Sequence, residues 1–363
     1  MAVMLKQPIS RVIIVLSVAA SLWCTNTSRA QAVIKVGDSV RVRFGVLLQP
    51  QADWTQDPVT HNYQQNLFIR RMRLLVGGQV ARDVSFFLNI DNPNLGKSVN
   101  AVKNVSPAWV TVDGYLEVNV SSELSIGAGL IVIPLCHNAL QAGGNILPID
   151  LGAYSFLSSG PLKSPFGRDA GFQARGALFD DRLEYRVGGF AGTRDSVPTN
   201  AFRGSGRLQY NFFEYDPSFF TAGTYLGKRK MFSIGGGVDA QQDYKAFAAD
   251  AFLELPATSG SVTAQVDFIH YNGGNTLRTL PKQNTFLLEA GYLLSEIGVM
   301  PWVKIEGQYF ANVSGSDQRR HQIGLTYFFR GQNLNIKAGY GRIDPEVGSE
   351  QNLFTAQLQA FYF

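Results

Sequence analysis

The chain has 363 residues, 45% of them hydrophobic and 12% aromatic, and its mean hydropathy is -0.02. A protein built from membrane-spanning helices would be far more apolar, and beyond the N-terminal segment no apolar run reaches about 18 residues. A membrane β-barrel alternates lipid-facing with water-facing residues, so its average hydropathy is close to neutral.

The N-terminus resembles an export signal. A positive residue, Lys6, precedes an apolar run over 12–23, and two small-x-small sites follow, which would permit cleavage after Ala30 or Ala32. An apolar run of this length is too short for a spanning helix. We therefore expect 1–32 to be a cleaved secretory signal peptide.

Removal of this segment lowers the net charge of the protein. It takes away three basic residues and no acidic one, which leaves 29 basic and 28 acidic residues in 33–363. A net charge of +1 gives no reason to expect nucleic-acid binding. One cysteine, Cys136, then remains, so no intramolecular disulfide is expected.

The remaining chain shows strand periodicity. Apolar and polar residues alternate over about ten residues at a time, with turn residues between the segments. The alternation is clearest over 39–48, 170–178, 183–192, 322–329, 334–340 and 354–362. The apolar phase mixes aromatics with alanine and glycine, which suits lipid better than a close-packed core. We therefore predict an all-β fold, a membrane-spanning antiparallel β-barrel that occupies 33–363.

The spacing predicts about sixteen strands. They begin near 38, 65, 83, 106, 123, 168, 182, 201, 230, 243, 260, 284, 300, 320, 333 and 351. An even number places both termini in the periplasm, with long external loops and short periplasmic turns. One periplasmic turn, 213–229, is too long for this pattern, and a further strand pair near 217–229 would give eighteen strands.

The last residues are Phe361, Tyr362 and Phe363. A terminal aromatic residue is expected as the handle for outer-membrane assembly, although here the apolar phase runs through Tyr362. Together with the export signal, this ending predicts that the protein is located in the outer membrane of a Gram-negative-type bacterium.

Three segments carry a resemblance, in their order and spacing, to the phosphate-selective porin O and P family. They are the arginine-rich stretch 68–73, the glycine-containing strand 124–134 that leads into a long loop, and the hairpin from 165–169 through 190–192. The resemblance covers most of 33–363. It implies a water-filled barrel, usually trimeric, that passes small hydrophilic solutes, and it does not fix the solute.

The connection 135–167 joins the fifth and sixth predicted strands. In sixteen-stranded porins that connection folds into the lumen and narrows it. Here it carries little charge, namely Asp150 and Lys163, and contains Gly143 and Gly144. We expect it to form the constriction, and the alternative is an ordinary external loop.

Arginines occupy the predicted lumen phase of several strands. Arginine remains charged and binds anionic oxygens in a fork, so rings of it favour anions in pores. The candidate selectivity residues are Arg41, Arg43, Arg71, Arg73, Arg175, Arg186, Arg203 and Arg207. The equally weighted alternative is a solvated wall whose charges are balanced by Glu184, Asp267, Glu289 and Glu306.

Enzymatic chemistry is not expected. The four histidines, at 61, 137, 270 and 321, show no Ser/His/acid spacing, and a metal cluster of the Cys/His type is not expected with one cysteine. We predict a porin for passive diffusion of small hydrophilic solutes, with a modest preference for phosphate-like anions. No cofactor is expected, and the expected partners are outer-membrane lipid and lipopolysaccharide, small anionic solutes and two further copies in a homotrimer. The alternatives are a structural or adhesive barrel and a barrel hydrolase.

Overall fold

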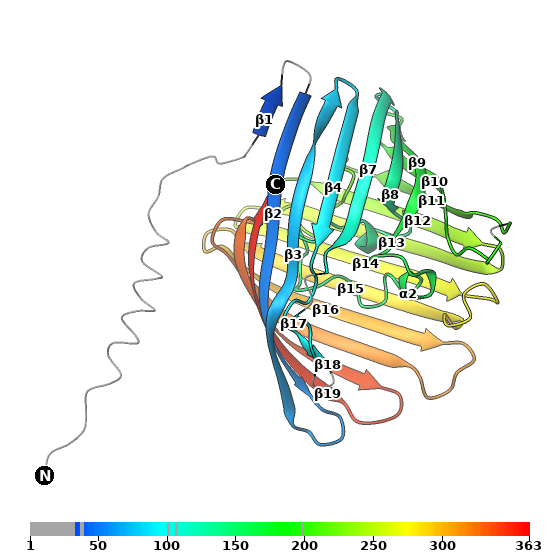
Figure 1. The fold of residues 1–363 in the computed structure, drawn as a ribbon. Coiled ribbons are helices and arrows are strands. Elements are labelled where there is room, and N and C mark those ends of the chain that lie inside the picture. The colour runs from blue at the N-terminus through cyan, green and yellow to red at the C-terminus, as the bar shows by residue number, and fades with distance from the viewer. Residues whose placement is uncertain (1–32, 37–39, 100–101, 106–107, 198) are drawn as a thin grey trace, which may run out of the picture.

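The computed structural model of the protein describes residues 33–363 except 37–39, 100–101, 106–107 and 198 (Figure 1). Sixteen antiparallel strands pair in chain order. The last, β19 (Gln351–Tyr362), pairs with the first, β2 (Val40–Gln56), and so closes the barrel. The predicted sixteen-stranded barrel is confirmed. The predicted signal peptide, 1–32, lies outside the described residues.

The other wall strands begin within a few residues of their predicted starts. They are β3 (Tyr63–Ala81), β4 (Val84–Asp91), β7 (Val110–Ser121), β8 (Leu124–Val132), β9 (Arg168–Leu178), β10 (Leu183–Phe190), β11 (Arg203–Asn211), β12 (Met231–Gln241), β13 (Tyr244–Ala257), β14 (Gly260–Asn272), β15 (Gln283–Leu294), β16 (Val299–Phe310), β17 (Gln318–Phe328) and β18 (Leu334–Pro345). Short strands lie beside this wall: β1 (Val33–Val36), which pairs with β2, and the hairpin of β5 (Ser98–Val99) and β6 (Val102–Lys103). Two short helices, η1 (Asn138–Leu140) and α2 (Ser159–Leu162), occur between β8 and β9.

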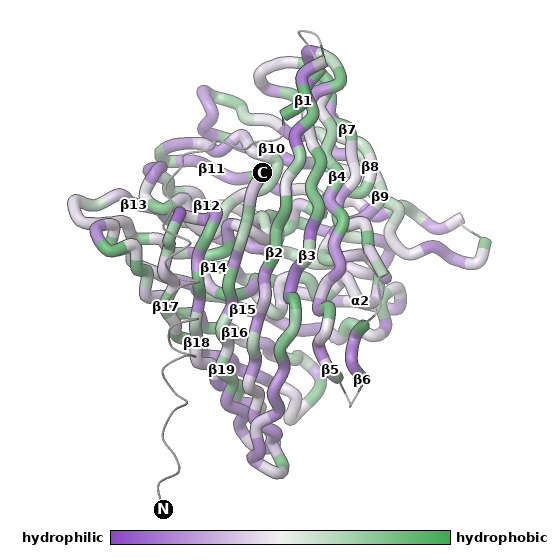
Figure 2. Tube along the Cα trace, turned by 60° about the vertical axis from the view of Figure 1, so that its left-hand side comes forward, coloured by the Kyte–Doolittle hydropathy of each residue, from purple (hydrophilic) through white to green (hydrophobic). Residues whose placement is uncertain are grey.

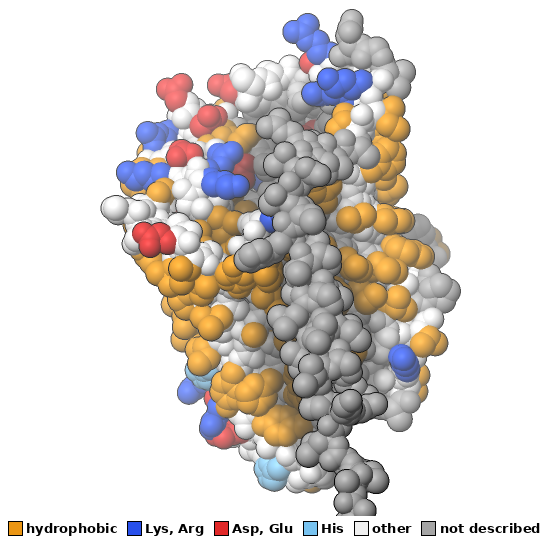
Figure 3. Space-filling model, turned by 90° about the vertical axis from the view of Figure 1, so that its left-hand side faces the viewer, with side chains coloured by type: hydrophobic (Ala, Val, Ile, Leu, Met, Phe, Trp, Pro, Cys, Tyr) orange, Lys and Arg blue, Asp and Glu red, His pale blue; other side chains and the backbone are white. Residues whose placement is uncertain are grey.

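Successive residues of each wall strand point alternately into the barrel and toward its outer surface. Along β16, Met300, Trp302 and Lys304 are buried on the inner face, whereas Pro301 and Val303 are exposed on the outer face. A lysine or arginine on the lipid side would cost about 2–4 kcal/mol at the bilayer midplane, and the charged side chains of β16, Lys304 and Glu306, lie on the inner face. Figure 2 shows this alternation of hydropathy along the strands, and Figure 3 shows hydrophobic side chains over the middle of the outer wall, with charged ones toward its two ends.

The two ends of the barrel differ. At one end the strands are joined by short turns, at 82–83, 122–123, 179–182, 258–259, 295–298 and 329–333. At the other end lie the long loops, at 92–109, 133–167, 191–202 and 273–282. Short turns face the periplasm in outer-membrane barrels, so we call these the periplasmic and external ends. No helix in the described part of the chain is long and apolar enough to cross a bilayer.

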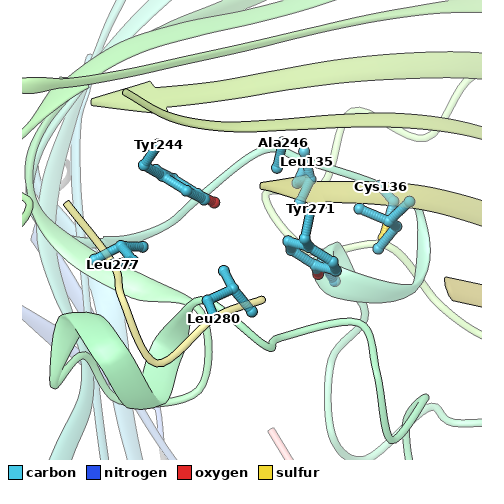
Figure 4. Packing of buried hydrophobic residues seen from close by; sticks show 9 residues of the cluster. Leu135, Cys136, Tyr244, Ala246, Tyr271, Leu277 and Leu280 are labelled. Carbon is cyan, nitrogen blue, oxygen red and sulfur yellow. The ribbon is translucent and has the colours of Figure 1, made fainter. Parts of the chain in front are cut away.

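The barrel interior holds packed apolar residues as well as polar ones. In one cluster, Leu135 and Cys136 from the connection between β8 and β9 pack against Tyr244 and Tyr271 of the wall and Leu277 of an external loop (Figure 4). The hydroxyl of Tyr271 donates to the carbonyl of Tyr154 at 3.2 Å. The connection is therefore anchored inside the barrel by apolar contacts as well as by hydrogen bonds.

Candidate functional site

The segment 133–167, here called the inner loop, leaves β8 and folds back inside the barrel. Lys337 of β18 donates from Nζ to the carbonyls of Ile146 at 2.7 Å and Pro148 at 2.6 Å. Lys304 of β16 does the same for Asp150 at 3.0 Å and Leu151 at 2.8 Å. Buried carbonyls need donors, and these two lysines supply them from the opposite wall. The inner loop therefore crosses the lumen.

Acidic side chains of the wall bind the start of the same loop. The amide of His137 donates to Asp250 at 3.3 Å, and the amide of Asn138 donates to Asp267 at 3.2 Å. Both carboxylates lie on the inner face of their strands, and they accept hydrogen bonds from the backbone of the inner loop.

Asp150 joins the inner loop to the arginine-rich strand β3. Its carboxylate lies 3.1 Å from Nε of Arg70 and 2.8 Å from a terminal nitrogen of Arg71. Burial alone would raise the pKa of Asp150, but the charges of Arg70 and Arg71 outweigh it and hold that pKa well below its usual range. Asp150 is therefore held as a carboxylate between the two arginines and anchors the inner loop to β3.

A second segment enters the lumen from the periplasmic end. Residues 212–230, between β11 and β12, form no strand, so the further strand pair considered for this region is wrong. Instead this segment, here called the inner turn, pairs with the inner loop. Thr221 donates from its amide to the carbonyl of Leu140, and its own carbonyl accepts from the amide of Ala142, both at 3.0 Å. The amide of Gly223 donates to the carbonyl of Asn145 at 2.8 Å.

The inner turn is also held by the wall. Arg186 donates to the carbonyl of Phe219 at 2.7 Å, and Arg175 donates to that of Pro217 at 2.9 Å. Glu254 accepts from the amide of Tyr225 at 2.9 Å. These contacts satisfy the polar backbone of a turn that would otherwise be unpaired inside the barrel. The inner loop and inner turn thus form one packed body beside the β10–β19 part of the wall.

Open space remains on the other side, along β2–β9. A cavity of about 760 Å³ lies toward the periplasmic end, and a smaller one of about 110 Å³ adjoins it. Both cavities have Arg73, Gly143 and Arg168 in their walls, so they meet at these three residues. The meeting point lies between strand β3 and the inner loop.

Arginines outnumber acids around this path. The charged side chains in the two walls are Arg41, Arg43, Arg70, Arg71, Arg73, Arg168 and Arg175, against Asp91, Asp113, Glu117 and Asp150. Each acid has an arginine partner, with closest distances of 2.7–2.9 Å. Arg41 hydrogen bonds Gln79, and Arg43 lies over the ring of Phe363 at 4.0 Å. The excess positive charge is therefore concentrated near the periplasmic opening.

The predicted selectivity residues divide into two groups. Those that line the cavities are Arg41, Arg43, Arg71, Arg73 and Arg175. The other three, Arg186, Arg203 and Arg207, are buried and paired with Glu184, Asp239 and Asp250. They point inward as expected, but they support the inner loop and inner turn and line neither cavity.

The two charged residues of the inner loop also differ. Asp150 lines the smaller cavity, whereas Lys163 is exposed at the end of α2 and lines neither cavity. The four acids considered as a balancing set, Glu184, Asp267, Glu289 and Glu306, are buried on the inner face and likewise line neither of these cavities.

Two arginines of the cavity walls, Arg168 and Arg70, are not among the candidates from the sequence. Arg168 begins β9 out of phase with Gln173 and Arg175, so alternation predicts it on the lipid face, yet it pairs with Asp113 at 2.9 Å. Arg70 shares a phase with the apolar residues Met72 and Leu74, so alternation predicts it on the outer face, but it contacts Asp150. The inward position of Arg70 depends on its ion pair with Asp150, which is distant in the sequence, and the alternation of a single strand does not reveal such a partner.

The histidines have partners that do not form a catalytic arrangement. His137 contacts the carbonyl of Ala222 and stacks on Phe252, His270 contacts Asn284, and His321 lies 3.5 Å from Asp344. Across the described ranges no group of three or more His, Cys, Asp or Glu residues could hold a metal ion.

No protein-family model and no curated protein matches the chain. Solved outer-membrane barrels do match its fold. Salmonella typhi OmpF, solved with daunomycin, matches at a TM-score of 0.62 and 15% identity, covering 91% of this chain and 100% of that one. An anion-selective porin from Comamonas acidovorans matches at 0.58 and 8%, covering 88% and 99%. Vibrio cholerae OmpT in its trimer form matches at 0.54 and 12%, covering 90% and 100%. The protein thus has the barrel fold of these porins.

Proposed function

We propose that the protein is a porin through which small hydrophilic solutes diffuse passively, with a modest preference for anions. The observation that carries the proposal is the pair of adjoining cavities along β2–β9, in which seven arginines face four acids. Fixed positive charge in a narrow wet passage attracts anions and repels cations. The finer proposal, a preference for phosphate-like anions, rests on the family resemblance.

The inner loop is the proposed constriction. It fills part of the lumen and leaves the passage between itself and β3, where Gly143 lies close to Arg71 and Arg73. Deletion of 140–160 should therefore increase single-channel conductance, and an unchanged conductance would reject this role.

We also propose that three copies associate in the membrane. On the outer face, an apolar hollow of about 950 Å³ runs over β15–β19 and β2, with small residues such as Gly291, Ala338 and Ala356 at its base. Small residues let two walls approach closely. Lipid and lipopolysaccharide would cover the rest of the belt. Native mass determination in detergent tests the assembly, and a monomer would reject it.

Planar-bilayer recording tests the function itself. A tenfold gradient of potassium chloride should give stepwise currents and a reversal potential of the sign for chloride preference. A cation preference would reject the anion proposal alone. Absence of steps would favour the structural barrel, and hydrolysis of phospholipid by the purified protein would favour an enzyme.

A further inference from the structure

Aromatic rings gather on the wall of the larger cavity. Phe363 lies 5.4 Å from Phe87, Phe87 lies 5.8 Å from Phe220, and Phe220 lies 5.1 Å from Phe219, measured between ring centroids. Phe219 in turn stacks on Tyr115 at 4.3 Å. All five rings border the same 760 Å³ space. They form a continuous apolar surface in a lumen whose walls are otherwise rich in charge.

The five rings come from distant parts of the chain. Phe87 is on β4, Tyr115 on β7, Phe219 and Phe220 on the inner turn, and Phe363 is the last residue. The half-buried rings of Phe87, Phe220 and Phe363 leave apolar surface in contact with the cavity. A channel for water and ions does not require an apolar surface in its wall. Ligand pockets, in contrast, typically combine aromatic walls with a few placed polar groups.

A positive charge stands at one end of this surface. The guanidinium of Arg43 lies over the ring of Phe363 at 4.0 Å. Among the described residues no carboxylate forms an ion pair with Arg43, whereas Arg73, Arg168 and Arg175 each have one. A guanidinium that stacks on a ring keeps its edge donors available for a carboxylate fork.

We propose that the larger cavity is a binding subsite for organic anions that carry an apolar planar ring, with Arg43 binding the charge and Phe87 and Phe220 contacting the ring. The inference rests on the proposed porin function and deepens it, because it names the class of anion that is retained during passage. Inorganic anions would pass without retention, since they have nothing to place against the rings. The volume of about 760 Å³ accommodates a single-ring carboxylate with its water.

The test is block of the chloride current by three sodium carboxylates added at the periplasmic end: benzoate, cyclohexanecarboxylate and acetate. Benzoate should block at a concentration up to about tenfold lower than cyclohexanecarboxylate, because a ring–ring contact strengthens binding by roughly that factor beyond apolar burial. Acetate, which has no ring, should require the highest concentration. Calorimetric titration of the detergent-folded protein with the same salts measures the subsite even if the barrel does not conduct.

Variants separate the two parts of the subsite. Phe87→Leu and Phe220→Leu keep apolar volume and should bring benzoate to the level of cyclohexanecarboxylate. Phe172→Leu is the matched control, since this ring is 68% exposed on the outer face of β9, and it should leave block unchanged. Arg43→Gln should weaken binding of all three anions.

Equal binding of benzoate and acetate, with chloride preference intact, would overturn the subsite and leave the porin proposal standing. Loss of chloride preference or of conductance, with benzoate still bound more tightly in the titration, would overturn the porin proposal and leave the subsite. Equal loss of benzoate binding in the Phe172→Leu control would also overturn the assignment to these rings.

Discussion

The amide of Ala142 donates a hydrogen bond to the carbonyl of Thr221 at 3.0 Å, and this contact joins a loop from the external end of the barrel to a turn from the periplasmic end. Two further backbone bonds, from Thr221 to Leu140 and from Gly223 to Asn145, continue the pairing. The lumen is therefore divided by a body supported from both ends.

Shortening the inner turn should widen the passage. Removal of 216–225 deletes Phe219 and Phe220 from the cavity wall and takes away the three backbone bonds to the inner loop. We expect a larger single-channel conductance with more open-channel noise, because the inner loop loses its backbone bonds to the inner turn and keeps only its contacts with the wall. A deletion of 347–349, in an exposed external loop, is the control and should change neither quantity. Unchanged conductance in the 216–225 deletion would contradict the role given to the inner turn.

Lys337→Met should loosen the inner loop. The variant keeps most of the buried side-chain volume but leaves the carbonyls of Ile146 and Pro148 without their donor. Loss of such partners costs about 1–3 kcal/mol. Limited proteolysis should then cut within the inner loop faster than in the parent protein, while the barrel itself stays intact on unheated gels. Equal protection of the loop would show that the lysine does not hold it.

Neutralisation of the periplasmic arginines should reduce chloride preference. With Arg41→Gln and Arg43→Gln together, the chloride-to-potassium permeability ratio should fall about two- to fivefold, as expected for loss of a favourable interaction of about 0.5–1 kcal/mol. Arg319→Gln removes a single exposed charge that lines neither cavity and should leave the ratio unchanged. Reversal potentials provide the measurement, and an equal shift in the control would point to net charge instead of the passage.

The strand positions followed from the sequence because lipid imposes a strict two-residue period on every wall strand. The segments that fill the lumen could not be predicted in the same way. Alternation correctly placed Arg186, Arg203 and Arg207 on the inner face, but it could not show that the inner loop and inner turn would cover them. The excessive length of 213–229 was visible, yet length alone did not distinguish an extra strand pair from an inserted turn.

Acid should loosen the inner loop near His137. Burial lowers the pKa of this side chain to about 4, with Arg207 acting in the same direction and Asp250 opposing it. An opened loop would bind a proton at about pH 6.5, so the closed arrangement is fully favoured above that pH. As the pH falls from 6.5 toward 4, up to about 3 kcal/mol of this stability is lost.

Hydrogen exchange of 137–145 should therefore be faster at pH 4.5 than at pH 7, after correction for the intrinsic rate. His137→Gln should remove the difference, because glutamine can still donate to the carbonyl of Ala222 and does not titrate. Persistence of the same acceleration in that variant would assign the effect to another group.

A side chain at Gly143 should obstruct the passage. A Cβ there would lie 3.0 Å from Nη1 of Arg73 and 3.4 Å from Nε of Arg71, at the point where the two cavities meet. Gly143→Leu should lower single-channel conductance. Gly160→Leu adds the same side chain to α2, where nothing lies within 4 Å, and should leave conductance unchanged.

The most direct test of the proposed anion-preferring passage is the single-channel current of the wild-type protein in a planar bilayer under a potassium chloride gradient. We expect discrete steps and a reversal potential on the chloride side, since the passage along β2–β9 carries more arginines than acids. A barrel that inserts but passes no current, or one that selects potassium, would contradict this expectation.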